Sequence, residues 1–284
     1  MLITKLTKRK NNKQRKGNPR WRGFPWYLWI AFGLVICLAA TLIVITNPFT
    51  PTSPVQTDGL TAAIVDQLSA AAPNPDFIEQ ATQDLKSAGF TKIDIYKQDE
   101  VTVDFYRQLP SHGYKLIIFR VHAGLLENET GRGNKIWMFT SQSYSRLQFY
   151  IAQLRNQVTV AKISNTDAPV FAVSAKFVTD CMSHNFANTV IINMGCSAFY
   201  SSEMAQAYIK RGASTYIGWD ASVGITYVDD AAMTLLDKLC AQNMTIKQAV
   251  KETVKEKGPD PNNNANLKYY PQTNADKTIQ QLIK

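Results

Sequence analysis

The sequence of 284 residues predicts an α/β domain with a doubly wound, mainly parallel sheet, preceded by one N-terminal transmembrane helix. Short apolar segments alternate with amphipathic ones from residue 73 onward, which is typical of a parallel sheet with helices on both faces. Two of the apolar segments, YKLIIFRV and TVIINM, are almost continuous, as in central strands buried on both faces. The uncharged run from Gly23 to Thr57 predicts the membrane helix.

Basic residues are concentrated at the N-terminus. The chain has 31 Lys and Arg against 22 Asp and Glu, a net charge of +9, and residues 1–22 contain nine of the basic residues and no acidic one. The remainder of the chain is therefore formally neutral. Basic tails bind nucleic acid in some proteins, but the apolar run that follows favours a cytoplasmic tail over 1–22, and no nucleic-acid partner is expected.

The predicted transmembrane signal-anchor helix covers residues 23–46. Trp26 to Thr46 are mostly apolar and would span about 32 Å as a helix, close to the thickness of a bilayer core. A cleavable signal peptide is the alternative, but the apolar run is too long and lacks a good cleavage site. The positive-inside rule places the tail in the cytoplasm and the C-terminal domain outside the cell membrane, with the lipid bilayer as a partner.

The remaining elements follow in order. Residues 47–59 are rich in Pro and Thr and predict an extended linker. The domain is expected over 60–258, beginning with a short helix in 60–72. A helix over 75–88 is indicated by Asn74-Pro75 at its start and Gly89 after its end. A polar, loose tail is expected over 259–284.

Strands are expected at 91–96, 114–121, 135–140, 188–194 and 214–219. Further helices are expected near 101–109, 144–157, 200–211, 227–242 and 245–257. Residues 158–187 are compatible with a strand, a helix, or one after the other. Asp229 and Asp230 would lie in the first turn of the helix over 227–242, where acidic side chains interact favourably with the helix dipole.

Two reactive side chains follow the two most apolar strands. His122 comes directly after strand 114–121, and Cys196 follows strand 188–194 through Gly195. Carboxyl ends of parallel strands form the crevice of such folds, so a His–Cys pair suited to nucleophilic catalysis is expected there. A helix starting after Cys196 would lower the pKa of the thiol. A buried structural cysteine and a surface histidine are the alternative, and no cofactor or metal ion is expected.

The strand–His segment IIFRVHAG, the strand–Gly–Cys segment VIINMGCSAF and the later GASTYIGWDASVGITYVDDAAMTLLDKL resemble the caspase–separase–gingipain superfamily of cysteine peptidases. The resemblance covers roughly residues 90–255 and is greatest to the separase and CHAT branch. It implies a caspase-like fold and a membrane-anchored cysteine endopeptidase that acts on a protein or peptide substrate. It assigns His122 as general base or orienting residue and Cys196 as nucleophile, with oxyanion donors near Gly124 and Cys196.

The resemblance also gives Asp220 a role. This residue ends strand 214–219 and resembles the acid near which some relatives bind a basic P1 side chain, which a carboxylate selects by a charge-assisted hydrogen bond. An acid that caps a helix or a loop is the alternative.

Two features depart from the family. It usually has His-Gly, whereas this chain has His122-Ala123-Gly124, and the spacing from His122 to Cys196 is long. A catalytically inactive surface binding or scaffold module therefore stays an alternative, as does a transamidase with the same thioester chemistry. Cys181 and Cys240 are the expected disulfide pair in an oxidising compartment, and the sequons at Asn128 and Asn243 are potential glycan acceptors.

Overall fold

The computed structural model describes residues 59–128, 131–162, 164 and 166–284, all within one compact unit. No helix in this part of the chain is long and apolar enough to cross a membrane. The predicted tail over 1–22, the predicted span over 23–46 and all of the linker except Gly59 lie outside the described residues.

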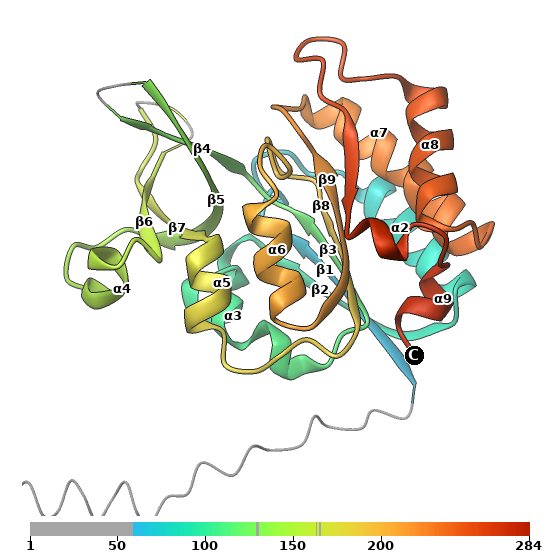
Figure 1. Ribbon diagram of the computed structural model, residues 1–284. Helices are drawn as coiled ribbons and strands as arrows, with labels where there is room; N and C mark the ends of the chain where they lie inside the picture. The colour runs from blue at the N-terminus through green and yellow to red at the C-terminus, as the bar shows by residue number, and fades with distance from the viewer. Residues whose placement is uncertain (1–58, 129–130, 163, 165) are drawn as a thin grey trace, which may run out of the picture. The chain divides into compact units, whose positions relative to one another are not determined.

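A six-stranded sheet forms the centre of the unit (Figure 1), with the strand order β10-β9-β8-β3-β1-β2. All neighbouring pairs are parallel except β10 with β9. The predicted α/β fold with a mainly parallel sheet is confirmed. The strands are β1 (Leu60–Asp66), β2 (Phe90–Lys97), β3 (Leu116–Arg120), β8 (Thr189–Asn193), β9 (Ala213–Trp219) and β10 (Leu267–Tyr270).

Helices cover both faces of this sheet and bury two separate apolar clusters (Figure 1). One face carries α2 (Pro75–Ser87), α7 (Ile225–Leu236), α8 (Ile246–Lys257) and α9 (Ile279–Leu282), and a π-helical turn, η3 (Asp237–Ala241), continues α7. The other face carries α3 (Val103–Gln108), α5 (Ala175–Cys181) and α6 (Glu203–Lys210). Short 3-10 turns are η1 (Gln98–Glu100), η2 (Leu109–His112) and η4 (Gln272–Asn274).

A second sheet of four antiparallel strands has the order β4-β5-β7-β6. Its strands are β4 (Ala123–Asn128), β5 (Gly131–Ser143), β6 (Val158–Ala161) and β7 (Val170–Ser174), and α4 (Tyr150–Leu154) lies beside β6. Between β3 and β4 the chain has only Val121 and His122. The polypeptide therefore passes from the large sheet to the small sheet at the predicted catalytic histidine.

Two predicted helices differ from the structure, and one open assignment is decided. The predicted helix over 60–72 is wrong, because Leu60–Asp66 forms β1 between β2 and β3, and Ala62–Val65 are completely buried. Burial against neighbours on both sides outweighs the helix propensity of the alanines. The predicted helix over 144–157 is reduced to α4. Residues 158–187 take the third of the alternatives, because β7 is followed directly by α5.

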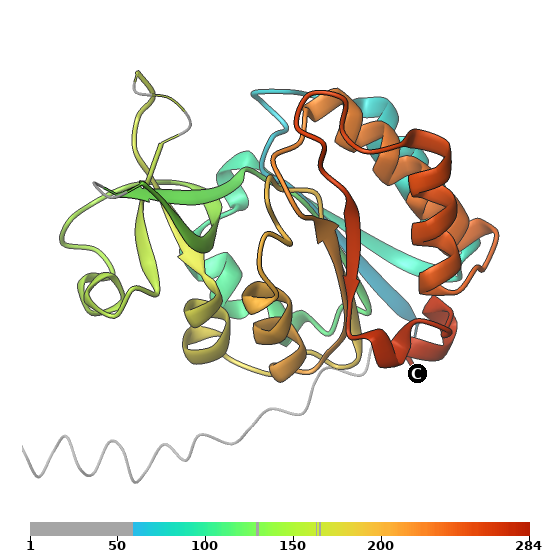
Figure 2. The same ribbon diagram turned by 45° about the horizontal axis from the view of Figure 1, so that its top comes forward.

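The loose tail expected after Gly258 is also wrong. In Figure 2 the red strand β10 lies along β9, and its residues pair in antiparallel register from Leu267 opposite Trp219 to Tyr270 opposite Tyr216. Beyond it, Ile279 and Leu282 of α9 are buried in the same apolar cluster as α2 and α7. Residues 259–266 consist mainly of Pro and Asn, which indicates a loop, and this composition outweighed the apolar residues that follow in the prediction.

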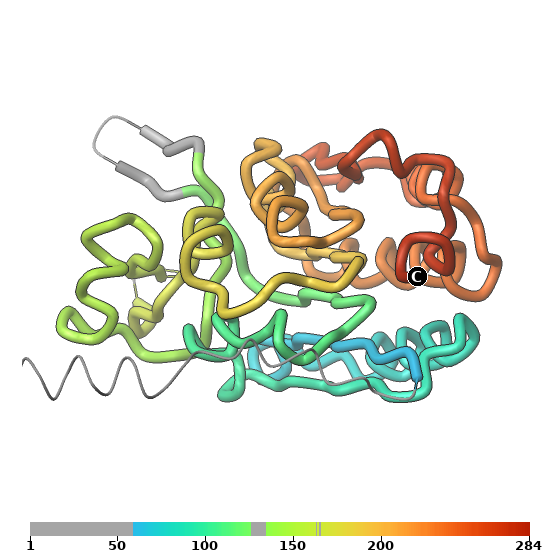
Figure 3. Tube along the Cα trace, turned by 60° about the horizontal axis from the view of Figure 1, so that its bottom comes forward, coloured from blue at the N-terminus to red at the C-terminus, as the bar shows by residue number. Residues whose placement is uncertain are grey.

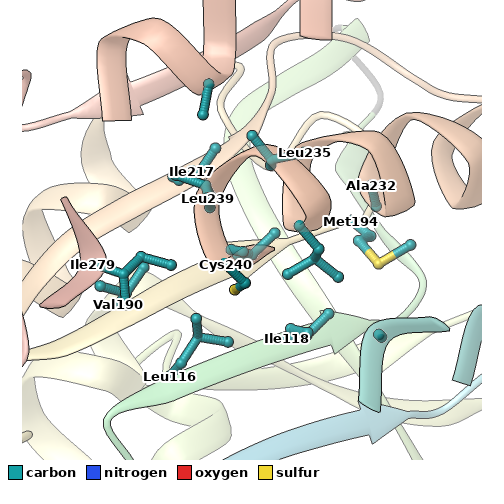
Figure 4. Packing of buried hydrophobic residues seen from close by; sticks show 14 of the residues in the cluster. Leu116, Ile118, Val190, Met194, Ile217, Ala232, Leu235, Leu239, Cys240 and Ile279 are labelled. Atoms are coloured by element: carbon teal, nitrogen blue, oxygen red, sulfur yellow. The ribbon is translucent and has the colours of Figure 1, made fainter. Parts of the chain in front are cut away.

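The predicted disulfide between Cys181 and Cys240 is wrong, because both cysteines are free. Figure 4 shows Cys240 among the aliphatic side chains of β3, β8, α7 and η3. Cys181 packs against the cluster on the opposite face, so the large sheet separates the two thiols. Burial raises the pKa of Cys240 to about 12, as expected of a thiol that serves as a small core residue.

Candidate active site

Strands β3 and β8 bring His122 and Cys196 to the same edge of the large sheet. The two strands pair in parallel with Phe119 opposite Asn193, and the Met194 N–H donates to the Phe119 carbonyl at 2.8 Å. His122 comes three residues after Phe119, and Cys196 comes three residues after Asn193. The two side chains therefore belong to equivalent positions beyond the carboxyl ends of neighbouring strands, as the sequence predicts.

A close backbone approach connects the two segments. A Cβ atom added to Gly195 would lie 2.7 Å from the Cβ of Ala123 and 3.0 Å from the carbonyl oxygen of Val121. Real Cβ atoms do not approach other atoms at 2.7 Å, so position 195 requires glycine unless the chain shifts. The residue before Cys196 thus lies against the two residues on either side of His122.

Asn193 shapes the turn that carries Cys196. Its side chain is completely buried, and its Oδ1 accepts the Gly195 N–H at 2.9 Å. Its Nδ2 donates to the Tyr216 hydroxyl oxygen, also at 2.9 Å. Both hydrogen bonds fix the end of β8, because a buried amide left without partners would destabilise the fold.

Cys196 is half-buried beside the loop that follows β9. Its Sγ lies 3.6 Å from the Val223 carbonyl oxygen and 3.5 Å from the Val223 backbone nitrogen. The next residue, Ser197, has a left-handed backbone (φ +56°), and its N–H donates to the Ala221 carbonyl at 2.8 Å. Among the described residues, none accepts a hydrogen bond from the Cys196 N–H.

The helix expected to polarise the thiol does not start at Cys196. Residues 197–200 form a turn, and α6 begins only at Glu203. The dipole of α6 therefore does not begin at the sulfur.

The His122 backbone is held from two directions. Its N–H donates to Gln67 Oε1 at 2.9 Å, and its carbonyl accepts the Phe139 N–H at 2.9 Å. The imidazole lies 6.1 Å from the Phe139 ring, centroid to centroid. Burial lowers the pKa of His122, Asp167 opposes this and the Arg120 guanidinium adds to it. A lowered pKa leaves the imidazole neutral at neutral pH, as a general base requires.

Two residues before His122, at the end of β3, Arg120 belongs to a buried cluster of charged side chains. Arg120 is 1% exposed, and it donates to Asp229 of α7 through Nε and Nη2 at 2.8 and 2.7 Å. It also donates to Asp66, the last residue of β1, at 2.8 Å, and to the Ala72 carbonyl at 2.8 Å. Asn74 adds a donor to Asp229 at 2.9 Å.

This Arg120 cluster, defined as Arg120, Asp66, Asp229 and Asn74, joins β1, β3, α2 and α7 at the crevice edge. Burial alone would lower the pKa of Arg120, but the two carboxylates outweigh it and raise the pKa. Burial raises the pKa of Asp66, although Arg120 opposes the change. Asp229 is therefore a buried ion-pair partner within α7, not an acid in the first turn as the sequence predicts.

Gly124 lies in the ladder between β4 and β5, opposite Trp137. The hydrogen bond from the Phe139 N–H to the His122 carbonyl shows that His122 and Phe139 are a hydrogen-bonded pair of this antiparallel ladder. Alternation along the ladder makes Gly124 and Trp137 the next hydrogen-bonded pair and leaves the Ala123 N–H pointing away from β5. The geometry therefore favours Ala123 over Gly124 as a free backbone donor next to His122.

Asp220 directly follows β9 and contacts the segment that leads into β10. Its Oδ1 accepts the Asn266 N–H at 2.7 Å, and its Oδ2 lies 3.6 Å from Lys268 Nζ. These contacts are those of the loop acid that the sequence leaves open as an alternative. The adjoining loop is held by buried Asp260, whose Oδ2 accepts the Gly224 N–H at 2.8 Å.

Sequence reasoning missed Gln67 and Asp66 because residues 60–72 read as a helix rather than as a strand ending at the crevice. It missed Asp167 because nothing in the sequence places that loop near His122.

In the described part of the chain, no three His, Cys, Asp or Glu side chains gather as ligands of a metal ion would. No family model matches the chain, and a search of curated proteins finds no significant match.

Proposed function

We propose that this chain is a membrane-anchored cysteine endopeptidase of caspase-like fold, with His122 as general base and Cys196 as nucleophile. The observation that carries the proposal is the equivalent placement of the two residues after β3 and β8, with Gly195 packed against Ala123. The predicted span over 23–46 would hold the domain at the outer face of the cell membrane.

The proposed reaction is acyl transfer through a thioester. His122 takes the proton of the Cys196 thiol, and the thiolate attacks the substrate carbonyl carbon. The N–H groups of Cys196 and Ala123 donate to the oxyanion. His122 then returns the proton to the leaving amine, and a water molecule hydrolyses the thioester to release the acid and restore the thiol. An amine in place of that water would make the same chain a transamidase.

A preference for Arg or Lys at P1 is the finer part of the proposal. Asp220 is the candidate carboxylate, and its Oδ2 is engaged by Lys268 only at 3.6 Å. Asp167 is a second candidate, since it is exposed and its charge acts on His122. Replacing each by Asn distinguishes the two candidates. Substitution of the carboxylate that binds the P1 side chain should remove the preference for Arg or Lys, while cleavage of other peptides continues.

An inactive binding module of the same fold is the second candidate function. The contact between Cys196 Sγ and the Val223 peptide favours it, because a substrate carbonyl has to reach the same sulfur. Activity then requires the loop over 220–224 to move.

Turnover of a peptide library by the purified full-length chain in detergent micelles decides between the candidates. We expect cleavage, its loss in Cys196→Ala, and a fall of about 100-fold or more in kcat for His122→Ala. Cys181→Ala is the matched control, since that half-buried thiol lies on α5, and it should retain activity. Folded wild-type protein that cleaves nothing, or Cys196→Ala that still cleaves, would exclude the peptidase.

A further inference from the structure

An apolar surface next to the small sheet has no covering in the described part of the chain. We define the α4 patch as five exposed side chains: Leu147 (87% exposed), Tyr150 (55%), Ile151 (57%), Leu154 (64%) and Val160 (40%). Figure 3 shows α4 and the preceding loop at one extremity of the tube, far from α7 and α8. These five are most of the exposed large apolar side chains among the described residues, so the surface is concentrated rather than scattered.

The patch is held in place by the side chains behind it. The Phe149 ring packs against the Phe171 ring at 5.2 Å, so it points into the domain while its neighbours stay exposed. Gln153 Nε2 donates to the carbonyls of Ser145 at 3.0 Å and Gln148 at 2.7 Å, and its Oε1 accepts the Tyr144 hydroxyl at 2.9 Å. The loop that presents Leu147 is therefore fixed to α4 by a polar network.

The positions of the apolar residues follow a helical spacing. Leu147, Tyr150, Ile151 and Leu154 recur at i, i+3, i+4 and i+7, which in a soluble domain predicts a stripe packed on the core. In the structure, Tyr150, Ile151 and Leu154 lie on α4 and Leu147 lies in the bend before it, and all four side chains are exposed. Exposed apolar side chains that lie beside basic ones are typical of segments that lie in the interface of a membrane.

The charge of this region selects the partner. Residues 131–166 contain five basic residues and no acidic one, whereas the rest of 23–284 contains 17 basic and 22 acidic residues. Arg146, Arg155 and Lys162 are exposed and lie within two residues of members of the patch in the sequence. A second copy of this chain in a two-fold contact would oppose these like charges, so self-association is disfavoured. A surface of anionic lipid headgroups satisfies the charges while its acyl region accepts the apolar side chains.

We propose that the α4 patch binds the surface of an anionic lipid bilayer, with Leu147, Tyr150, Ile151 and Leu154 in the headgroup–acyl boundary and the basic residues against the headgroups. This contact is independent of the proposed catalytic pair. It would fix which way the crevice faces relative to the membrane.

A photoreactive benzoylphenylalanine that replaces Leu147 in the full-length chain tests the contact. The chain is reconstituted in vesicles of phosphatidylcholine with or without phosphatidylglycerol, irradiated, and examined by mass spectrometry. We expect phospholipid adducts at position 147 that increase with phosphatidylglycerol. The matched control places the same residue at Ile95, an exposed position of β2 (37%), where few adducts are expected.

A charge series gives the second measurement. Arg146→Gln with Arg155→Gln should lower the adduct yield at position 147 by about tenfold, because each basic residue near an anionic surface adds to the attraction. Lys247→Gln with Lys251→Gln on α8 removes the same charge elsewhere and should leave the yield unchanged. Unchanged near-UV circular dichroism establishes that each variant is folded. Adducts to a second copy of the chain or to another protein, equal lipid adducts at 147 and 95, no lipid adduct at 147, or no dependence on phosphatidylglycerol would each overturn the proposal.

Discussion

Replacement of Arg120 by methionine should destabilise the domain strongly. Methionine keeps much of the volume but removes all four hydrogen bonds, of 2.7–2.8 Å, that Arg120 donates to Asp229, Asp66 and the Ala72 carbonyl. Asp66 and Asp229 are 3% exposed each, so both carboxylates stay buried without a cation. Removing one partner of a buried ion pair costs about 3–5 kcal/mol, a large share of the roughly 5–15 kcal/mol that stabilises a typical domain.

The sign of the pH dependence provides an independent check. Burial already raises the pKa of Asp66 above its ordinary value in the wild type, and removal of Arg120 raises it further, because the guanidinium no longer opposes the effect of burial. Such a group contributes stability that is present below the unfolded pKa and is lost as pH rises through the folded pKa. The deficit of Arg120→Met relative to wild type should therefore be small near pH 4 and grow toward pH 7.

Urea unfolding of the full-length chain in detergent micelles, followed by far-UV circular dichroism, measures the loss. Arg155→Met is the control, since Arg155 is exposed, and it should change the free energy of unfolding by less than about 0.5 kcal/mol. A loss below about 1 kcal/mol for Arg120→Met at pH 7, or a deficit that does not grow with pH, would refute the role given to the Arg120 cluster.

Two further substitutions test other parts of the structure. Burial raises the pKa of Asp84 to about 6 and its Oδ2 has no partner among the described residues, so the wild-type domain should lose stability as pH rises from about 4 through 6. Asp84→Asn should remove that loss and raise stability at pH 7 by about 1 kcal/mol in thermal unfolding; an unchanged pH profile would contradict this assignment. Gly195→Ala should cost about 1–3 kcal/mol in urea unfolding and abolish turnover, because its Cβ would collide with Ala123. Gly124→Ala meets nothing within 4 Å and should leave stability within about 0.5 kcal/mol, so equal effects of the two alanines would contradict the close approach.

The sequence predicts those elements whose signals are local. Asn74-Pro75 and Gly89 mark α2 correctly because capping depends on a few neighbouring residues. The apolar runs of β3 and β8 are equally clear, because the middle of a strand that is buried on both faces is apolar. Because β3 and β8 are parallel neighbours, their carboxyl ends lie at the same edge of the sheet, and this places His122 and Cys196 at a common edge.

The missed elements depend on contacts distant in sequence. Leu60–Asp66 forms a strand only because β2 and β3 pair with it on either side. The spacing of Leu147, Tyr150, Ile151 and Leu154 predicts a core-facing helix, yet only the last three lie on a helix and all four are exposed. The preference of Ala123 over Gly124 as a backbone donor depends on the register of β4 and β5, which no motif records.

The proposed catalytic pair requires that His122 activates Cys196 across the edge shared by β3 and β8. The most direct test is the rate at which iodoacetamide alkylates each cysteine of the full-length chain at pH 7, resolved by peptide mass spectrometry, in wild type and His122→Ala. Cys181 is an internal reference, because burial raises its pKa and keeps it slow. We predict that Cys196 reacts at least about tenfold faster in wild type than in His122→Ala, while Cys181 reacts equally in both. Equal rates for Cys196 in the two proteins would contradict the catalytic pair.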